Sequence, residues 1–237
     1  MGILVPEDVE IYDAEKIIDW AVKQFGNKVG LSSSFSAEDV VIIDVLVKVC
    51  NKVGIEPNVF TIDTGRLPSE TYEVIDRVRE KYGIKVKVYF PDYREVEEMV
   101  NNYGMNLFYE SVEKRELCCE IRKVRPLKRA LEGLEAWITG LRREQSVTRK
   151  DIKKLEIDVI HNNIYKINPL ADWSEKMVWD YIKENKIPYN ALYDKGYASI
   201  GCAPCTRPIK KTEDIRAGRW WWEALEHKEC GIHVKKF

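Results

Sequence analysis

Short apolar runs alternate with helical patterns through the first 140 residues, and this alternation restricts the fold more than any other feature of the chain. Residues 28–35 are expected to form a strand that runs into a serine-rich loop, and further strands are expected at residues 58–63, 84–90 and 136–139. Helices are expected at residues 14–25, 37–49, 69–82, 94–103 and about 119–132. Strands that alternate with helices are typical of a parallel sheet covered by helices on both faces. We therefore predict an α/β fold with a mostly parallel sheet.

The pattern changes after Gly140. Two short strands are expected near residues 155–160 and 164–168, then a helix at about 174–185, and loop-like chain from residue 197 onward. A length of 237 residues suits one large domain. The last twenty residues do not resemble another layer of a sheet, so we predict one domain over residues 1–216 and a C-terminal tail over residues 217–237.

The composition excludes several classes of protein. The chain has 38 Lys and Arg against 39 Asp and Glu, so its charge gives no general attraction to nucleic acid or to an anionic membrane. No apolar run is long enough to cross a bilayer, and the first residues lack the basic start and apolar stretch of a signal peptide. We expect a cytoplasmic protein with no nucleic-acid or membrane partner.

A serine-rich turn follows the first predicted strand. The turn consists of Ser32, Ser33, Ser34, Phe35 and Ser36. Ser36 is predicted to cap the next helix, with Asp39 as its capping partner. Free N–H groups at a helix start favour an anion when they lie at the carboxyl edge of a sheet. A capped helix without a ligand is the alternative, and for an isolated turn it is the commoner case.

Cationic side chains crowd the loop after the strand at residues 136–139. Arg142, Arg143 and Arg149 fall within eight residues, at the carboxyl edge of the predicted sheet. Guanidinium groups bind phosphate and sulfate by two-point contacts. A turn after the strand at residues 58–63 joins this edge and consists of Asp63, Thr64, Gly65 and Arg66. A solvated basic loop is the alternative, but the position favours a nucleotide that carries an extra anionic group.

Four cysteines form two pairs, Cys118 beside Cys119 and Cys202 with Cys205 in a C-x-x-C. Adjacent thiols are poorly placed for a disulfide, and cytosolic cysteines at motif spacing more often bind metal or act in catalysis. Four thiolates can hold zinc or an iron–sulfur cluster. The adjacent pair suits several irons better than a single zinc, which favours the cluster.

Cys230 stands apart from the other cysteines. It has no partner in sequence for a disulfide or a cluster, while His233, Arg216 and Arg219 lie near it in the chain. Cationic neighbours lower the pKa of a thiol and make it a better nucleophile. Cys230 is therefore a candidate nucleophile on the tail, whereas Cys50 ends an aliphatic helix and is expected to be a buried small residue.

From about residue 28 to its end, the chain resembles the assimilatory sulfonucleotide reductases, and most closely their iron–sulfur branch that uses adenosine 5′-phosphosulfate (APS). The resemblance rests on SSSFSAEDVV, FTIDTGR, CCEIRK, TGLRREQS-x-TR, GCAPCT, RAGRWWWE and ECGIH, which occur in this order. One departure is Ile232, where leucine is more usual. The family reduces APS, or its 3′-phosphorylated form (PAPS), to sulfite.

This resemblance implies an adenine nucleotide α-hydrolase-like fold, which is Rossmann-like, and a [4Fe-4S] cluster on Cys118, Cys119, Cys202 and Cys205. It implies that Cys230 is the nucleophile, that AMP is released, and that thioredoxin or a similar thiol is the reductant. The implied substrate contacts come from the serine turn with Asp39, the turn at residues 63–66, and Lys123, Arg142, Arg143, Gln145, Arg149, Arg216, Arg219 and His233. We also expect a homo-oligomer.

Three alternatives remain open from the sequence. The protein could be a cluster-containing enzyme that prefers or accepts PAPS, because no pocket for a 3′-phosphate can be located. It could be an ATP pyrophosphatase that adenylates or thiolates its substrate, although the glycine-rich SGGxD loop of that group is absent. It could be a zinc-binding module without activity, although such a module would need neither Cys230 nor the arginine-rich loop.

Overall fold

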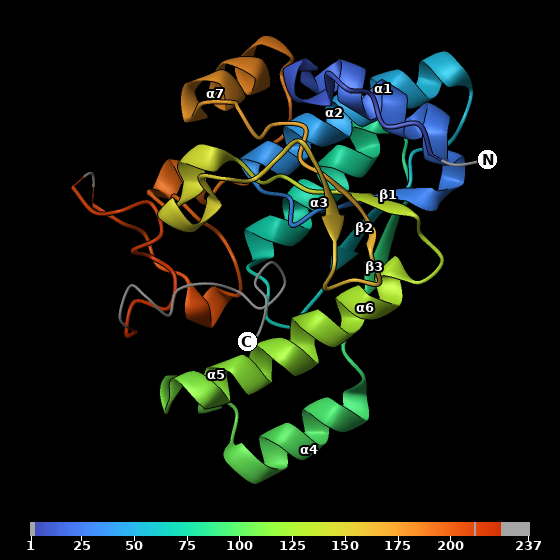
Figure 1. Ribbon diagram of the computed structural model, residues 1–237. Coiled ribbons are helices and arrows are strands. Elements are labelled where there is room, and N and C mark those ends of the chain that lie inside the picture. The colour runs from blue at the N-terminus through green and yellow to red at the C-terminus, as the bar shows by residue number, and fades with distance from the viewer. Residues whose placement is uncertain (1–2, 211, 224–237) are drawn as a thin grey trace. The chain divides into compact units, whose positions relative to one another are not determined.

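The computed structural model describes residues 3–210 and 212–223 and contains a six-stranded sheet in the order β3-β2-β1-β4-β6-β5 (Figure 1). Its strands are β1 (Val29–Ser32), β2 (Val59–Ile62), β3 (Val86–Tyr89), β4 (Ala136–Ile138), β5 (Leu155–Asp158) and β6 (Ile164–Ile167). β1 pairs in parallel with β2 and β4, β4 pairs in parallel with β6, and β5 returns antiparallel to β6. The predicted α/β fold with a mostly parallel sheet is confirmed.

The described α-helices follow the predicted order. They are α1 (Ala14–Phe25), α2 (Ala37–Val53), α3 (Ser69–Tyr82), α4 (Tyr93–Tyr103), α5 (Val112–Cys119), α6 (Arg125–Leu131) and α7 (Glu175–Glu184). α2 runs four residues beyond its predicted end and stops at Gly54, whose φ of 74° is the left-handed conformation that glycine adopts at a helix C-cap. No helix of these residues is long and apolar enough to span a membrane.

The helix predicted at about residues 119–132 begins earlier than expected. α5 starts at Val112, where the Ser111 side chain accepts from Lys114 N–H, and it continues through a π-helical segment (Glu120–Val124) into α6. The sequence pattern misses this start because α5 is short and mostly polar. As a result, Cys118 and Cys119 lie in the last turn of a helix, directly before the π segment, and not in a loop.

The chain divides into two compact units. The sheet unit comprises residues 1–60, 73–87 and 133–190, and the cysteine unit comprises residues 61–72, 88–132 and 191–237. In the sheet unit, α2 contacts α1 and α7 (Figure 1). α2 is apolar around most of its circumference, as is typical of a helix buried between neighbours.

The cysteine unit has its own apolar core. Among its described residues, Met99, Leu107, Phe108, Ile121 and Trp220 are buried together with three of the cysteines. The metal-ligand candidates of the sequence therefore belong to the hydrophobic interior of this unit, where few water molecules compete for a ligand.

Candidate active site

The serine-rich turn is folded tightly around one carboxylate in the sheet unit. Ser36 caps α2 as predicted, because its side chain accepts from Asp39 N–H at 3.4 Å. Asp39 does not return the capping contact but accepts from the N–H and the hydroxyl of Ser34, at 2.6 and 2.8 Å. Phe35 is buried with a φ of 57°, and its N–H donates to the Ser33 hydroxyl. The turn therefore has a fixed shape, with Ser34 exposed at its tip.

Gly140, just after β4, permits this arrangement. A Cβ at residue 140 would overlap the Asp39 carboxylate, so only glycine lets the two segments come this close. Burial raises the pKa of Asp39 to about 6, although hydrogen bonds from Ser34 act in the opposite direction. The charge of Asp39 is thus sensitive to pH in the neutral range.

The variant Asp39→Asn should weaken the pH dependence of stability. The folded-state pKa lies above the ordinary value of about 4, so the stabilising contribution is complete below about pH 4 and is lost as pH rises through about 6. Between pH 4 and pH 7 the wild type should lose about 2 kcal/mol more unfolding free energy than the variant. Urea unfolding at both pH values measures this, with the surface variant Asp13→Asn as control. Equal pH dependence in Asp39→Asn and wild type would contradict the buried-carboxylate assignment.

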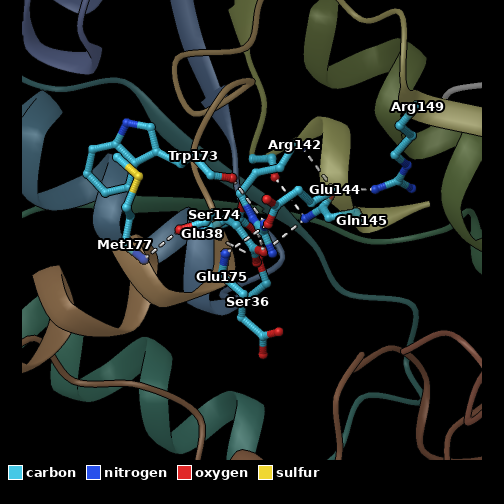
Figure 2. Close-up of polar contacts among 12 residues, drawn as sticks. Ser36, Glu38, Arg142, Glu144, Gln145, Arg149, Trp173, Ser174, Glu175 and Met177 are labelled. Atoms are coloured by element: carbon cyan, nitrogen blue, oxygen red, sulfur yellow. Dashed lines mark hydrogen bonds and ion pairs between the residues drawn. The ribbon is translucent and has the colours of Figure 1, made fainter. Parts of the chain in front are cut away.

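The arginine-rich loop is held by Glu38, a residue that was not predicted as part of the site. Glu38 accepts from Arg142 Nε at 2.9 Å and from Gln145 Nε2 at 3.0 Å (Figure 2). Arg142 is 2% exposed and also donates to the carbonyl of Trp173. No local pattern signals this contact, because Glu38 and Arg142 are far apart in the sequence.

The other predicted residues of this loop lie in different surroundings. Arg149 Nη1 donates to Gln145 Oε1 at 2.5 Å, which joins Arg149 to the Glu38 network (Figure 2). Arg143 instead donates to the Ile152 carbonyl and pairs with Glu10 at 3.0 Å. The structure therefore groups Arg142, Gln145 and Arg149, and it directs Arg143 to other partners.

In the cysteine unit, the turn after β2 meets the C-x-x-C loop. The Thr64 hydroxyl lies 3.2 Å from Cys202 Sγ, and the Arg66 carbonyl accepts from Ala203 N–H at 2.8 Å. Asp63 accepts from Gly65 N–H and from the Tyr72 hydroxyl. This turn was predicted to contact the nucleotide. Within the cysteine unit, its Thr64 contacts Cys202.

The two cysteine pairs line one pocket. Its cysteines are Cys118, Cys119, Cys202 and Cys205. Burial raises the pKa of the Cys118 thiol, and it raises the pKa of the Cys205 thiol to about 12. Without a bound metal these two thiols therefore stay protonated at neutral pH. Thiolates at such a depth need a cation or metal as partner.

Four cysteine side chains line the pocket, and an iron–sulfur cluster with four irons takes one thiolate at each iron. Among the residues that the structure describes, no three His, Cys, Asp or Glu side chains lie close enough to hold one metal ion.

Cations surround the same pocket. Its lining includes Arg66, Arg115, Arg122 and Lys123. Arg122 is 9% exposed, donates through Nη1 to the Thr64 carbonyl at 2.7 Å, and keeps a buried Nε with no partner in the described part of the chain. Trp220 Nε1, also in the lining, is likewise buried without a partner there. An anionic group in the pocket would satisfy these donors. The motif CCEIRK contains both Arg122 and Lys123, but only Lys123 was predicted as a residue of the site.

The remaining predicted residues lie toward the end of the chain. Arg219 is buried against Gly201 and donates to the Ile200 carbonyl at 3.2 Å, while Arg216 N–H donates to Asp214. Cys230 and His233 lie outside the described residues. Arg115 and Glu223, which form a buried ion pair, were not anticipated.

Comparison with known proteins identifies the family. The phosphoadenosine phosphosulfate reductase domain matches residues 28–208. The adenosine 5′-phosphosulfate reductase of Allochromatium vinosum is 50% identical over 206 residues, which cover 87% of this chain and 78% of that protein. The enzyme of the same name from Burkholderia cepacia is 48% identical over 220 residues, covering 92% of this chain and 86% of that one.

Solved structures agree with this result. The phosphoadenylyl-sulfate (PAPS) reductase of Candida auris has a TM-score of 0.72 and 28% identity, and the match covers 87% of this chain and 100% of that one. An FMN adenylyltransferase of Candida glabrata shares the fold, with a TM-score of 0.60 and 14% identity over 90% of this chain and 71% of that chain. The expected adenine nucleotide α-hydrolase-like fold is confirmed. The chain belongs to the phosphoadenosine phosphosulfate reductase domain family.

Proposed function

We propose that this protein reduces adenosine 5′-phosphosulfate to sulfite and AMP, as a step of sulfate assimilation. The observation that carries the proposal is the family match over residues 28–208, together with relatives named adenosine 5′-phosphosulfate reductase at 46–50% identity. The four-cysteine pocket supports the branch of the family that was expected from the sequence.

The pocket is the proposed site of a [4Fe-4S] cluster held by Cys118, Cys119, Cys202 and Cys205. Support comes from the burial of Cys118, Cys202 and Cys205, with Cys119 packed partly buried against them, and from the buried donors of Arg122 and Trp220 that have no partner in the described part of the chain. When bound, the cluster supplies negative charge beside Lys123, and it is not needed as an electron carrier because thiol chemistry accounts for the reduction. Lys123 is proposed to face the sulfate of the substrate and to be tuned by that charge.

The reducing equivalents are proposed to pass through thiols. The Cys230 thiolate attacks the sulfur of the sulfate group, the bond from that sulfur to the bridging oxygen breaks, and AMP leaves with the electron pair. An external dithiol then attacks the Cys230 sulfur and releases sulfite. The second thiol of that reductant closes a disulfide and frees Cys230. Sulfur goes from the sulfate to the sulfite oxidation level while one dithiol becomes a disulfide.

The chain offers several groups for the anionic substrate. We assign nucleotide binding to the serine turn, to the Arg142–Gln145–Arg149 group and to the turn at residues 63–66, and sulfate binding to Lys123, Arg216, Arg219 and His233. Arginine and lysine offset the charge that would otherwise keep a thiolate from a sulfate ester. Thioredoxin is the proposed reductant, in a cytoplasmic homo-oligomer with Cys230 on a C-terminal tail that starts near residue 217.

Sulfite release from APS and from PAPS, each with thioredoxin, tests the activity. We expect kcat/KM for APS to exceed that for PAPS by at least about tenfold, because the relatives at 46–50% identity are named for APS and a site built for APS would desolvate a 3′-phosphate without compensation. Preference for PAPS would establish the second candidate function, which the similarity to the Candida auris enzyme favours. Absence of sulfite from both substrates would refute the proposal.

A further inference from the structure

The chain segment that leads into residue 224 is fixed inside the cysteine unit by contacts that the proposed reaction does not use. The Glu223 carboxylate accepts from Nε and Nη2 of Arg115, each at 3.0 Å. The two side chains are 4% and 2% exposed. A buried two-point contact between guanidinium and carboxylate fixes the orientation of both groups as well as their distance.

Trp220 lies in this segment in a conformation that its surroundings must maintain. Its φ of 40° is unfavourable for an aromatic residue, and its side chain is 1% exposed. The guanidinium of Arg115 lies 4.9 Å from the centre of the indole ring, and that of Arg219 lies 4.7 Å from it. Strained backbone of this kind persists only where packing determines it, and it is frequent at functional sites.

The same segment is tied to both pairs of cysteines. Trp220 N–H donates to the Cys205 carbonyl at 3.2 Å, and Glu223 N–H donates to the Trp220 carbonyl at 2.9 Å. Arg115 belongs to α5, which carries Cys118 and Cys119 in its last turn. The C-x-x-C loop and α5, the helix that carries Cys118 and Cys119, therefore both contact the segment and fix its position.

We propose that Glu223, through Arg115 and Trp220, is a positioning residue that fixes the base of the C-terminal segment carrying Cys230. This inference rests on the proposed function in one respect, namely that Cys230 is the nucleophile. Cys230 follows Glu223 by seven residues, and seven residues of chain reach at most about 25 Å. A fixed base confines the thiol to that reach and raises its effective concentration at a bound substrate.

The variant Glu223→Gln tests the inference in the cluster-loaded protein. Glutamine keeps the size of the side chain but removes the charge and one of the two acceptor oxygens. Glu213→Gln is the matched control, because Glu213 also forms a two-point pair with Arg207 in the same unit, at a partly exposed position. Arg115→Lys keeps the positive charge without the two-point contact, and it takes the place of Glu223→Gln if that variant does not fold.

Three quantities are measured: amide hydrogen exchange at residues 219–223, the single-turnover rate of S-sulfocysteine formation from APS, and KM for APS. In Glu223→Gln we expect exchange at least about tenfold faster and sulfocysteine formation at least about tenfold slower, with KM within about twofold of wild type. Glu213→Gln should match the wild type in all three. A fall in the rate with unchanged KM is not expected from a general loss of structure.

Two results would overturn the inference. Hydrogen exchange in Glu223→Gln equal to that in Glu213→Gln would show that the ion pair does not fix the segment. Faster exchange with an unchanged rate of sulfocysteine formation would show that the fixed base does not serve Cys230. If the wild type itself forms no sulfocysteine from APS, the proposed function fails, and hydrogen exchange still decides whether the segment is fixed.

Discussion

Replacement of Cys230 by serine is expected to reduce sulfite release from APS by a factor on the order of 10⁴ or more, because the reaction would lose its proposed nucleophile. A serine hydroxyl is almost entirely protonated at neutral pH, and it cannot form the sulfur–sulfur bond from which a second thiol displaces sulfite. Binding of AMP should stay within about twofold of wild type, because the proposed nucleotide contacts lie elsewhere in the chain. Steady-state turnover with thioredoxin and AMP titration measure the two quantities.

Cys50 provides the matched control for this variant. It lies 1% exposed in α2, and burial raises the pKa of its thiol to about 11, so it is a poor nucleophile. Alanine is the suitable replacement there, since a buried serine hydroxyl would lack a partner. Cys50→Ala should retain turnover. Loss of activity in Cys50→Ala together with full activity in Cys230→Ser would contradict the assignment of Cys230 as the nucleophile.

Replacement of Cys205 by serine should remove the proposed cluster and, with it, activity. We expect bound iron to fall from about four atoms per chain to background. Turnover should fall by at least about 100-fold. The four-cysteine pocket and the cations proposed to bind sulfate belong to the same cysteine unit, so a change in the pocket should also displace those cations. The Trp220 N–H donates to the Cys205 carbonyl, so disorder at this position also reaches the base of the C-terminal segment.

Colorimetric iron and zinc analysis and the visible absorption of anaerobically purified protein check this expectation. Cys50→Ala again serves as the control and should keep its full iron content. Zinc in place of iron in the wild type, at one atom per chain, would contradict the cluster assignment. Full turnover in Cys205→Ser without iron would contradict any role of the pocket in the reaction.

Much of the sheet could be predicted because its signals are local. The alternation of apolar runs with helical patterns is visible in short windows, and Ser36 lies where an N-cap is expected. The start of α5 could not be found in this way, since its eight residues are mostly polar and its stability comes from tertiary contacts. The π segment after Cys119 is likewise a product of packing, and no residue pattern encodes it.

The candidate site shows the same division. Cysteine spacing predicted that two distant segments would share a site, and the structure brings Cys118, Cys119, Cys202 and Cys205 to one pocket. The partners of buried charges were not predictable. Glu38 with Arg142 and Glu223 with Arg115 are pairs separated by more than 100 residues, and neither carboxylate differs locally from a surface residue. Such pairs are visible only when the fold is known.

The most direct test of the proposed reaction is a single turnover of the wild type with APS in the absence of any thiol reductant. Peptide mass spectrometry should then find the mass of one SO₃ group on Cys230 alone, formed with one equivalent of AMP, and thioredoxin should remove that mass as sulfite. Release of AMP and sulfite without modification of Cys230, or a sulfonated residue elsewhere in the chain, would contradict the account.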